Sequence, residues 1–235
     1  MNEVLNIVHV DAVDLPDSWF QLVSKVLTIG REFVIDRGSF ADEKRLEFDY
    51  VTARIAQPWL RDTDGWPLIP VMPEGSTIPA PVSKEYLVDY APYIMTANRH
   101  ENEQYTYGQR LWAMKHEDVI INQVERVINT YKEHGHRNNQ MVLQVGHPSD
   151  LLLSDPSCLR HIDTRIQDNK LHFFIYFRSW DLWGGYPANL ALLSVLQEYM
   201  ASEIGVDPGE FVVSSKGLHL YKYVEELAKM RCGVV

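Results

Sequence analysis

The stretch YPANLALLSVLQEYMASEIG, from Tyr186 to Gly205, places the strongest constraint on how this chain can fold. Its apolar residues recur with helical spacing, Pro187 stands near the first turn and Gly205 follows the last apolar residue, which predicts one long helix. Apolar residues occupy much of the helix circumference, so we expect the helix to be largely buried. Such a helix needs a sheet or several other helices around it.

Strands flank this helix in the sequence. The segment 159–179, LRHIDTRIQDNKLHFFIYFRS, predicts a hairpin of two strands around QDNK. Further strands are expected at 45–58, 139–146 and 210–224, and further helices at 18–33, 83–95 and 116–135. We expect Ser18 to cap the first of these helices and Ile121 to lie on the apolar face of the last. The order of elements predicts an α+β fold with a helix inserted among mainly antiparallel strands.

Charge and length exclude several classes of protein. The 235 residues carry a net charge of −10 and no run of Lys or Arg, whereas binding to nucleic-acid phosphates needs a basic surface. No apolar run reaches the roughly 20 residues of a transmembrane helix. The start of the chain, MNEVLNIVHVDAV, lacks the basic residues and long apolar core of a signal peptide. We therefore expect a cytoplasmic protein with a single domain over 1–235, and neither a membrane nor a nucleic acid as partner.

The chain contains two cysteines, Cys158 and Cys232. Two cysteines cannot form a disulfide framework or a CxxC-type metal site, and we expect no metal. Cys158, in DPSCLRHI, is either a small buried residue or a nucleophile whose pKa is lowered by a nearby arginine. Cys232 lies close to the end of the sequence, in a segment expected to fray, and is the weaker candidate.

A cluster of polar residues surrounds the start of the long helix. Within twelve positions the segment YFRSWDLWGGYPANL holds Arg178, Ser179, Asp181 and Asn189. Arg and Ser suit a phosphate-like anion, although an Arg at a strand end can equally reach solvent. An Asn amide offers both a donor and an acceptor to the edge of a ring. His219 and Tyr221 alternate along the last strand, so their side chains face the same side.

The segments DPSCLRHI, FRSWDLWGGYPANLALL and LHLY closely resemble, in order and spacing, the motifs of the thymidylate synthase family. The resemblance is to the short archaeal type of that family and is strongest over 137–222, with weaker matches in YTYGQRL (105–111) and DRGSF (36–40). It implies a mixed, mostly antiparallel sheet packed with helices, one sheet face of which forms the interface of a homodimer. It also implies methylation of dUMP at C5 to give dTMP.

The chemistry that the resemblance implies begins with a thiolate. Addition of a thiolate to C6 of the uracil ring makes C5 nucleophilic enough to attack a one-carbon unit, and Cys158 matches this nucleophile. Arg178 matches a residue placed between the sulfur and the phosphate, and Ser179 a phosphate ligand. Arg37 matches a further phosphate-binding arginine, and Arg137 one that reaches the phosphate from the partner subunit.

The resemblance assigns the remaining roles as follows. Asn189 faces the base, where its amide accepts from N3–H and donates to O4; the same amide could flip to suit cytosine. His219 and Tyr221 hold the deoxyribose hydroxyl, and Asp181 orders the pterin ring of the donor. Tyr107 lies near the proton transfer at C5. The donor is 5,10-methylenetetrahydrofolate or methylene-tetrahydromethanopterin, between which the sequence does not choose.

Three departures from the family pattern leave alternatives open. The Glu-Leu-Leu-Trp-like helix that carries the catalytic glutamate is not found; Glu74 is our assignment for that residue and Glu85 is the alternative. Trp180 is bulkier than is usual between the Ser and the Asp. The C-terminal MRCGVV does not match the segment that closes over substrate. A pyrimidine hydroxymethylase of the same fold and a nucleotide-binding homologue without turnover therefore remain as alternatives.

Overall fold

A mixed sheet of six strands forms the centre of the molecule in this computed structural model, which describes residues 4–36, 43–101 and 103–233. In spatial order the strands are β1 (Ile7–Ala12), β4 (Tyr50–Ile55), β11 (Asp207–Ser215), β9 (Lys170–Phe177), β8 (Leu159–Gln167) and β7 (Val142–Gln144). The pairs β4–β11, β9–β8 and β8–β7 are antiparallel, and the pairs β1–β4 and β11–β9 are parallel. This arrangement confirms the predicted mixed, mostly antiparallel α+β class.

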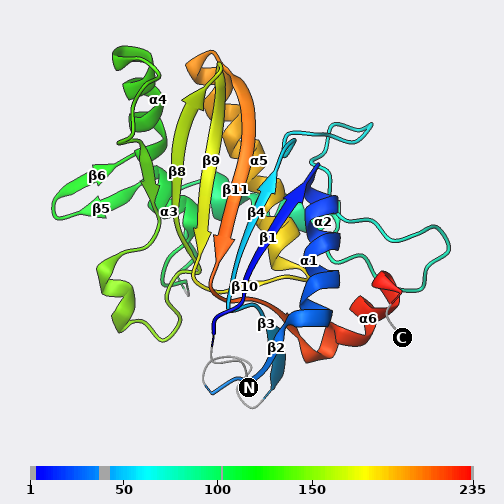
Figure 1. The fold of residues 1–235 in the computed structure, drawn as a ribbon. Helices are drawn as coiled ribbons and strands as arrows, with labels where there is room; N and C mark the ends of the chain where they lie inside the picture. The colour runs from blue at the N-terminus through cyan, green and yellow to red at the C-terminus, as the bar shows by residue number, and fades with distance from the viewer. Residues whose placement is uncertain (1–3, 37–42, 102, 234–235) are drawn as a thin grey trace.

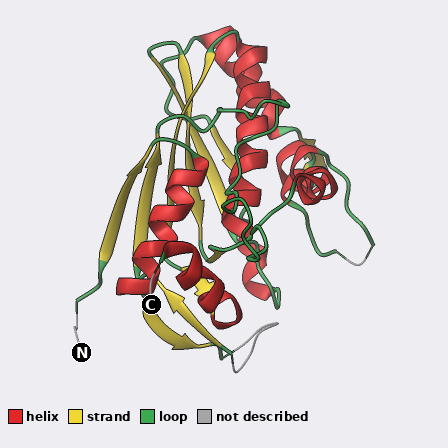
Figure 2. Cartoon of the chain, turned by 90° about the vertical axis from the view of Figure 1, so that its right-hand side faces the viewer, coloured by secondary structure: helices red, strands yellow, loops and turns green. Residues whose placement is uncertain are grey.

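The helices cover one face of this sheet. Helix α5 (Gly185–Ile204) packs against β9 and β11, behind which it runs in Figure 1, and α1 (Leu15–Ile29) packs against β1 and β4. In Figure 2 the strands gather on the left and the helices on the right. The outward-facing side chains of β1 are exposed, and those facing the helices are buried. In the described part of the chain, no helix covers the opposite face.

The long apolar helix is confirmed as the centre of the core. Thirteen of the 20 residues of α5 are buried. Its first turn contains Pro187, which needs no hydrogen-bond partner for its nitrogen there. It ends at Gly205, which has a φ of 88° in the left-handed region that favours glycine.

A second, smaller sheet lies at the foot of the first, as Figure 1 shows. Its order is β10 (Trp180–Asp181), β12 (Leu218–Tyr221), β3 (Lys44–Glu47) and β2 (Arg31–Val34). A separate hairpin consists of β5 (Met114–His116) and β6 (Val119–Ile121). The remaining helices are α2 (Lys84–Met95), α3 (Tyr107–Trp112), α4 (Gln123–His134), α6 (Lys222–Cys232) and the 3-10 helix η1 (Pro148–Leu152).

Two strands that the sequence predicts as continuous are each divided between the two sheets. The strand expected at 45–58 breaks after Glu47, so that β3 and β4 belong to different sheets. The strand expected at 210–224 breaks at Lys216 and Gly217, and β11 and β12 likewise separate. A Cβ at Gly217 would approach the carbonyl oxygen of Arg178 to 3.1 Å. Alternation in the sequence continues across each break, which is why hydrophobic periodicity does not detect it.

Helix boundaries also differ from the expectation. Helix α1 ends at Ile29, and residues 31–33, expected in the same helix, belong to β2. Helix α1 is capped by Asp14, whose carboxylate accepts from the Asp17 N–H, and Ser18 is buried inside the helix. Helix α4 begins at Gln123 behind an Asn122 cap, so Ile121 belongs to β6. The C-terminal segment expected to fray is helix α6, in which Glu225 forms ion pairs with residues three before and four after it, Lys222 and Lys229.

None of the helices in the described ranges is both long and apolar enough to cross a lipid bilayer.

Gly108, in the first turn of α3, allows the end of α2 to come into contact with this helix. A Cβ there would overlap the carbonyl oxygen of Thr96 and lie 2.9 Å from that of Ile94. We expect Gly108→Ala to lower the free energy of unfolding by about 1–3 kcal/mol, because backbone atoms must shift to relieve the overlap. Urea denaturation measures this difference. The neighbouring Gln109→Ala should change stability by no more than about 0.5 kcal/mol, and equal effects of the two substitutions would contradict the argument.

Candidate active site

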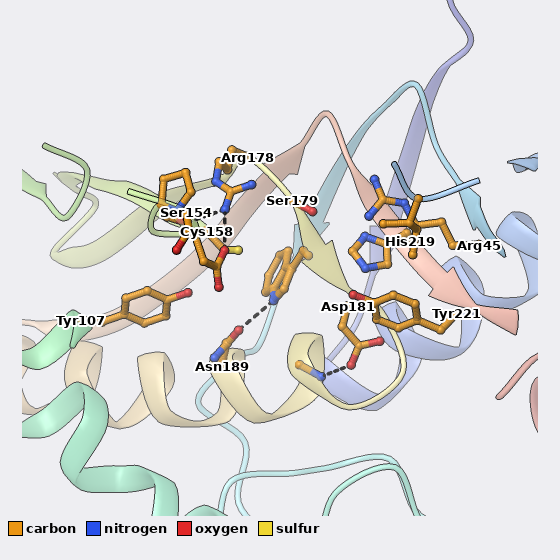
Figure 3. A pocket seen from close by; sticks show the side chains of 15 residues that line it. Arg45, Tyr107, Ser154, Cys158, Arg178, Ser179, Asp181, Asn189, His219 and Tyr221 are labelled. Atoms are coloured by element: carbon orange, nitrogen blue, oxygen red, sulfur yellow. Dashed lines mark hydrogen bonds and ion pairs between the residues drawn. The ribbon is translucent and has the colours of Figure 1, made fainter. Parts of the chain in front are cut away.

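One pocket, with a volume of about 480 Å³, lies where the first turn of α5, strands β10 and β12 and the loop before β8 converge. Eight of the residues singled out in the sequence line it: Tyr107, Cys158, Arg178, Ser179, Asp181, Asn189, His219 and Tyr221. In Figure 3, Cys158 and Arg178 lie at one side of the pocket and His219 and Tyr221 at the other, and Asn189 lies on α5 below Cys158. The structure thus brings together residues from four separate parts of the chain.

The other predicted residues lie elsewhere. Glu74 is in an exposed turn, Glu85 is exposed in the first turn of α2, and neither lines the pocket. The carboxylates that do line it, among the described residues, are Asp155 and Asp181. The roles assigned to Glu74 and Glu85 therefore stay predictions. Arg37 lies outside the described residues.

Arg137 is exposed in the loop between α4 and β7 and does not line the pocket. Strand β7 runs antiparallel to β8, with Val142 opposite Asp163, and Arg137 precedes β7 while Cys158 precedes β8. Extended backbone from Cys158 to Asp163 spans roughly 16 Å. This register places the start of β7, which Arg137 precedes, away from Cys158 of its own chain.

Cys158 and Arg178 lie side by side at the end of the β8–β9 hairpin, where the Arg178 N–H donates to the Cys158 carbonyl at 2.8 Å. The Arg178 guanidinium donates to the carbonyl oxygens of Pro156 and Ser157, and its Nη2 lies 3.2 Å from the exposed carboxylate of Asp155. These bonds hold the guanidinium at the wall of the pocket.

The pKa of the Cys158 thiol is raised, chiefly because the half-buried sulfur is removed from water. The charge of Arg178 lowers this pKa, as the sequence predicts for a nucleophile, and the charge of Asp155 raises it. Burial outweighs the arginine. The thiol is therefore mainly protonated at neutral pH, in contrast to the lowered pKa expected for a nucleophile from the sequence.

Asn189, in the second turn of α5, is 6% exposed and its amide is hydrogen-bonded on both sides. Its Oδ1 accepts from Trp180 Nε1 at 2.8 Å, the dashed line in Figure 3, and its Nδ2 donates to the Tyr90 hydroxyl at 2.9 Å. An amide oxygen has two lone pairs and an amide nitrogen two protons. One of each remains for a bound molecule.

His219 is 3% exposed, and its Nδ1 lies 2.8 Å from the Gly217 carbonyl oxygen. A carbonyl oxygen only accepts, so Nδ1 carries the proton. Burial lowers the pKa of this imidazole to about 4, and the ring is neutral at pH 7. Its buried Nε2 has no hydrogen-bond partner among the described residues, and is therefore an acceptor available to a hydroxyl group.

Asp181 anchors the start of α5. Its Oδ2 accepts from the backbone N–H groups of Gly184 and Gly185, at 3.0 and 2.8 Å, and its Oδ1 from that of Trp183 at 3.2 Å. A carboxylate at this position also interacts favourably with the helix dipole. The side chain is only partly buried, so its remaining lone pairs are accessible from the pocket.

Tyr107 is the first residue of α3 and belongs to a cluster of tyrosine rings with Tyr86, Tyr90, Tyr93 and Tyr105. Its hydroxyl accepts from the Leu159 N–H at 3.4 Å, next to Cys158. Burial raises the pKa of Tyr107 well above its usual value and that of Tyr93 to about 12. These phenols therefore remain protonated near neutral pH, and their hydroxyls can both donate and accept a hydrogen bond.

Two charged pocket residues were missed in the sequence, Arg45 and Asp155. Arg45 reaches the pocket because β3 pairs with β12, which places it opposite Tyr221, and its guanidinium pairs with Glu47. Pairing between strands so distant in the sequence leaves no local signal. Asp155, however, stands three positions before Cys158 and could have been found from that proximity.

No group of three or more His, Cys, Asp or Glu side chains within the described ranges is arranged to hold a metal ion.

Comparison with known proteins gives a consistent result over nearly the whole chain. A family model described as thymidylate synthase matches residues 53–232. A Methanosarcina mazei protein named "Putative thymidylate synthase" is 31% identical over 224 residues, which cover 93% of each chain. A Methanosarcina acetivorans protein of the same name is 30% identical over 222 residues, again 93% of each chain. A third, from Methanothermobacter thermautotrophicus, is 26% identical over 230 residues, or 94% of this chain and 98% of its own.

The charges around Cys158 predict how its reactivity depends on pH. In a Cys232→Ser background, the rate of alkylation by iodoacetamide follows the thiolate fraction of Cys158. Asp155→Asn removes a charge that raises the pKa of Cys158, so the curve of alkylation rate against pH should shift to lower pH in this variant. Arg178→Gln removes a charge that lowers the pKa, so its profile should shift to higher pH. Identical midpoints for the three proteins would show that burial alone controls the thiol.

Proposed function

The chain belongs to the thymidylate synthase family, and we propose on this basis that it converts dUMP to dTMP. The one-carbon donor in this proposal is a methylene-tetrahydropterin, either the folate or the methanopterin form, which acts as a second substrate and supplies the carbon and the hydride. The observation that carries the proposal is that Cys158, Arg178, Asn189 and His219 all line one pocket.

The anionic end of the nucleotide fits the side of the pocket beside Arg178. The planar guanidinium of Arg178 is oriented by hydrogen bonds to the carbonyl oxygens of Pro156 and Ser157. Ser179 follows Arg178 in the chain and lines the same pocket, and its hydroxyl can donate to a phosphate oxygen. Asp155 is 85% exposed and pairs with the same guanidinium. A phosphate would replace this carboxylate as the partner of Arg178.

The sugar fits the side of the pocket at His219, and the base fits at Asn189, within reach of Cys158. His219 Nε2 is an acceptor for a deoxyribose hydroxyl, and Tyr221 adjoins it with ring centroids 4.6 Å apart. The unused lone pair and proton of the Asn189 amide match N3–H and O4 of uracil. Asp181, with lone pairs accessible from the pocket, is the residue that would accept from the pterin.

Chemistry starts when Cys158 Sγ, as thiolate, forms a bond to C6 and the electron pair of the C5–C6 double bond moves toward O4. Carbon C5 of the resulting enolate then attacks the one-carbon unit. Arg178 favours the thiolate electrostatically. Afterwards C5 must lose its proton, and the bond between the transferred carbon and the pterin must break. The pterin must then deliver its hydride to the methylene group so formed, and the sulfur must leave C6. Tyr107, whose hydroxyl accepts from the Leu159 N–H next to Cys158, is the residue we assign to the proton transfer at C5.

A second candidate function follows from the missing glutamate. Glu74 and Glu85 do not line the pocket, and no other described glutamate does. A protein with this pocket but no base for the later proton transfer would bind nucleotide without turnover. A hydroxymethylase would still need that proton transfer, and would then add water instead of hydride to the methylene group on C5. Both alternatives share the nucleotide contacts of the first proposal, so they differ from it only in the product.

We also propose that the protein is a homodimer joined through the helix-free face of the six-stranded sheet. This face carries apolar and aromatic side chains, among them Ile7, which is 71% exposed, and Phe174, which is 36% exposed. Such groups on an open sheet favour burial against a second sheet. In such a dimer Arg137, which does not line the pocket of its own chain, would serve the pocket of the partner subunit.

Mass analysis of the nucleotide product tests the proposed reaction. Incubation with dUMP and each reduced pterin in turn should add a methyl group, whereas a hydroxymethyl group or an unchanged nucleotide would support the alternatives. Cys158→Ser should still bind dUMP and lose activity by on the order of 10³-fold or more, as expected for loss of an enzyme nucleophile. Cys232→Ser, remote from the pocket, should retain near wild-type activity. An active Cys158→Ser protein would rule out the mechanism.

The shared site predicts complementation between two inactive variants. Cys158→Ser and Arg137→Ala homodimers should each be nearly inactive. After subunit exchange, one of the two pockets of a mixed dimer combines a wild-type Cys158 with a wild-type Arg137, so activity should return to about one quarter of the wild-type value if exchange is statistical. Native mass spectrometry verifies the exchange. No recovery in an exchanged mixture would contradict a contribution of Arg137 across the interface.

A further inference from the structure

The amide of Asn189 is held in one orientation by its neighbours. Trp180 Nε1 lies 2.8 Å from Oδ1 on one side, and the Tyr90 hydroxyl lies 2.9 Å from Nδ2 on the other. An indole N–H can only donate, so the amide atom that faces it must be the oxygen. The Tyr90 hydroxyl can either donate or accept, and would tolerate both orientations. The orientation is therefore determined by Trp180.

This orientation decides which pyrimidine matches the pocket. With Oδ1 turned to the indole, the amide presents one lone pair on oxygen and one proton on nitrogen to a bound molecule. Uracil offers N3–H as donor and O4 as acceptor. Cytosine offers the reverse pattern, with an unprotonated N3 and an amino group at C4, so the amide would have to flip. A flipped amide would turn its NH₂ group toward the indole N–H, placing two donors face to face.

We propose that Trp180 is the positioning residue that makes this pocket select uracil over cytosine, by fixing the orientation of the Asn189 amide. The inference rests on the proposed function, because it assigns a pyrimidine nucleotide to the pocket. It goes further in assigning base selection to a second residue, since an unconstrained asparagine amide can serve either base.

Trp180 is itself held firmly enough for this role. The side chain is 3% exposed and its ring stacks on Phe177, with centroids 3.8 Å apart and planes 5° apart. On another side it meets the Tyr186 ring at 4.5 Å. Its backbone N–H donates to the Gly217 carbonyl at 2.9 Å, and β10 pairs with β12 at this residue. Side chains locked by packing in this way position a functional group precisely.

The test compares the binding of dUMP and dCMP to three variants. Trp180→Phe keeps an aromatic ring and removes the N–H. Replacement of Trp180 by 3-benzothienylalanine, in which sulfur takes the place of the indole N–H, keeps the bicyclic shape and so preserves the packing. Tyr90→Phe removes the other partner of the amide. Trp112→Phe is the matched control, because it removes an indole N–H that donates to the Ile94 carbonyl at 3.0 Å outside the pocket.

Isothermal titration calorimetry of the wild type should show tighter binding of dUMP than of dCMP. Both Trp180 replacements should reduce the ratio of the dCMP dissociation constant to the dUMP dissociation constant by about tenfold. The reason is that the hydrogen bond from Trp180 no longer opposes the flip of the Asn189 amide. Tyr90→Phe should weaken both nucleotides alike and Trp112→Phe should affect neither, so both ratios stay within about twofold of wild type.

The outcomes separate this inference from the function on which it rests. A wild type that binds neither nucleotide would refute the proposed function. A wild type that prefers dUMP, with a benzothienylalanine variant that retains the full preference, would overturn the role of Trp180 and leave the function intact. Loss of the preference in Tyr90→Phe to the same extent as in the Trp180 variants would also overturn it, because the hydroxyl would then be setting the orientation.

Discussion

Helix α5 packs along β9 and β11 with most of its surface buried, and the Asp181 carboxylate binds three backbone N–H groups just before its first turn. This packing determines where the reactive residues lie. The end of β9 delivers Arg178 and the start of β8 delivers Cys158, joined by one main-chain hydrogen bond. The second turn of α5 brings Asn189 to the same pocket. A shift of the helix along the sheet would separate the Asn189 amide from the Cys158 thiol.

The two sides of the pocket work by different physical means. Beside Cys158, charges compete: Arg178 lowers the pKa of the thiol, and burial and Asp155 raise it. The result is a thiol that is mainly protonated at neutral pH, and a protonated thiol is less reactive toward electrophiles than a thiolate. Displacement of the exposed Asp155 from Arg178 by a phosphate would leave the guanidinium within the pocket but would not by itself remove the cost of burying the sulfur. The enzyme chemistry proposed here therefore needs a proton acceptor for the thiol as well as the arginine.

Much of the fold could be predicted from local pattern, and what failed was long-range pairing. The long helix and the hairpin around QDNK each follow from the periodicity of their own segment, and the mixed α+β class follows from the order of such segments. These predictions are confirmed. The breaks in the strands after Glu47 and at Lys216–Gly217 were missed. The segments before and after each break have the same alternation of apolar and polar residues, and only their pairing in different sheets separates them. Most pocket residues could be found because they occur in short motifs. Arg45 could not, since its position depends on the pairing of β3 with β12, and the hydrogen bond from Trp180 to Asn189 depends on the mutual placement of a strand and a helix.

The neutral side of the pocket shows why specificity there does not require charge. His219 has a pKa near 4, so its Nε2 stays an acceptor throughout the neutral range, and the Asn189 amide does not ionise. In the proposed function both groups would recognise the nucleotide by the direction of a donor or an acceptor, and that direction depends on the contacts that hold each side chain. Gly217 accepts from Nδ1 of His219 and thereby determines its tautomer. Trp180 donates to Oδ1 of Asn189 and thereby determines its orientation. The Gly217 carbonyl oxygen also accepts from the backbone N–H of Trp180. The short connection between β11 and β12 therefore supports the orientation of both the His219 ring and the Asn189 amide.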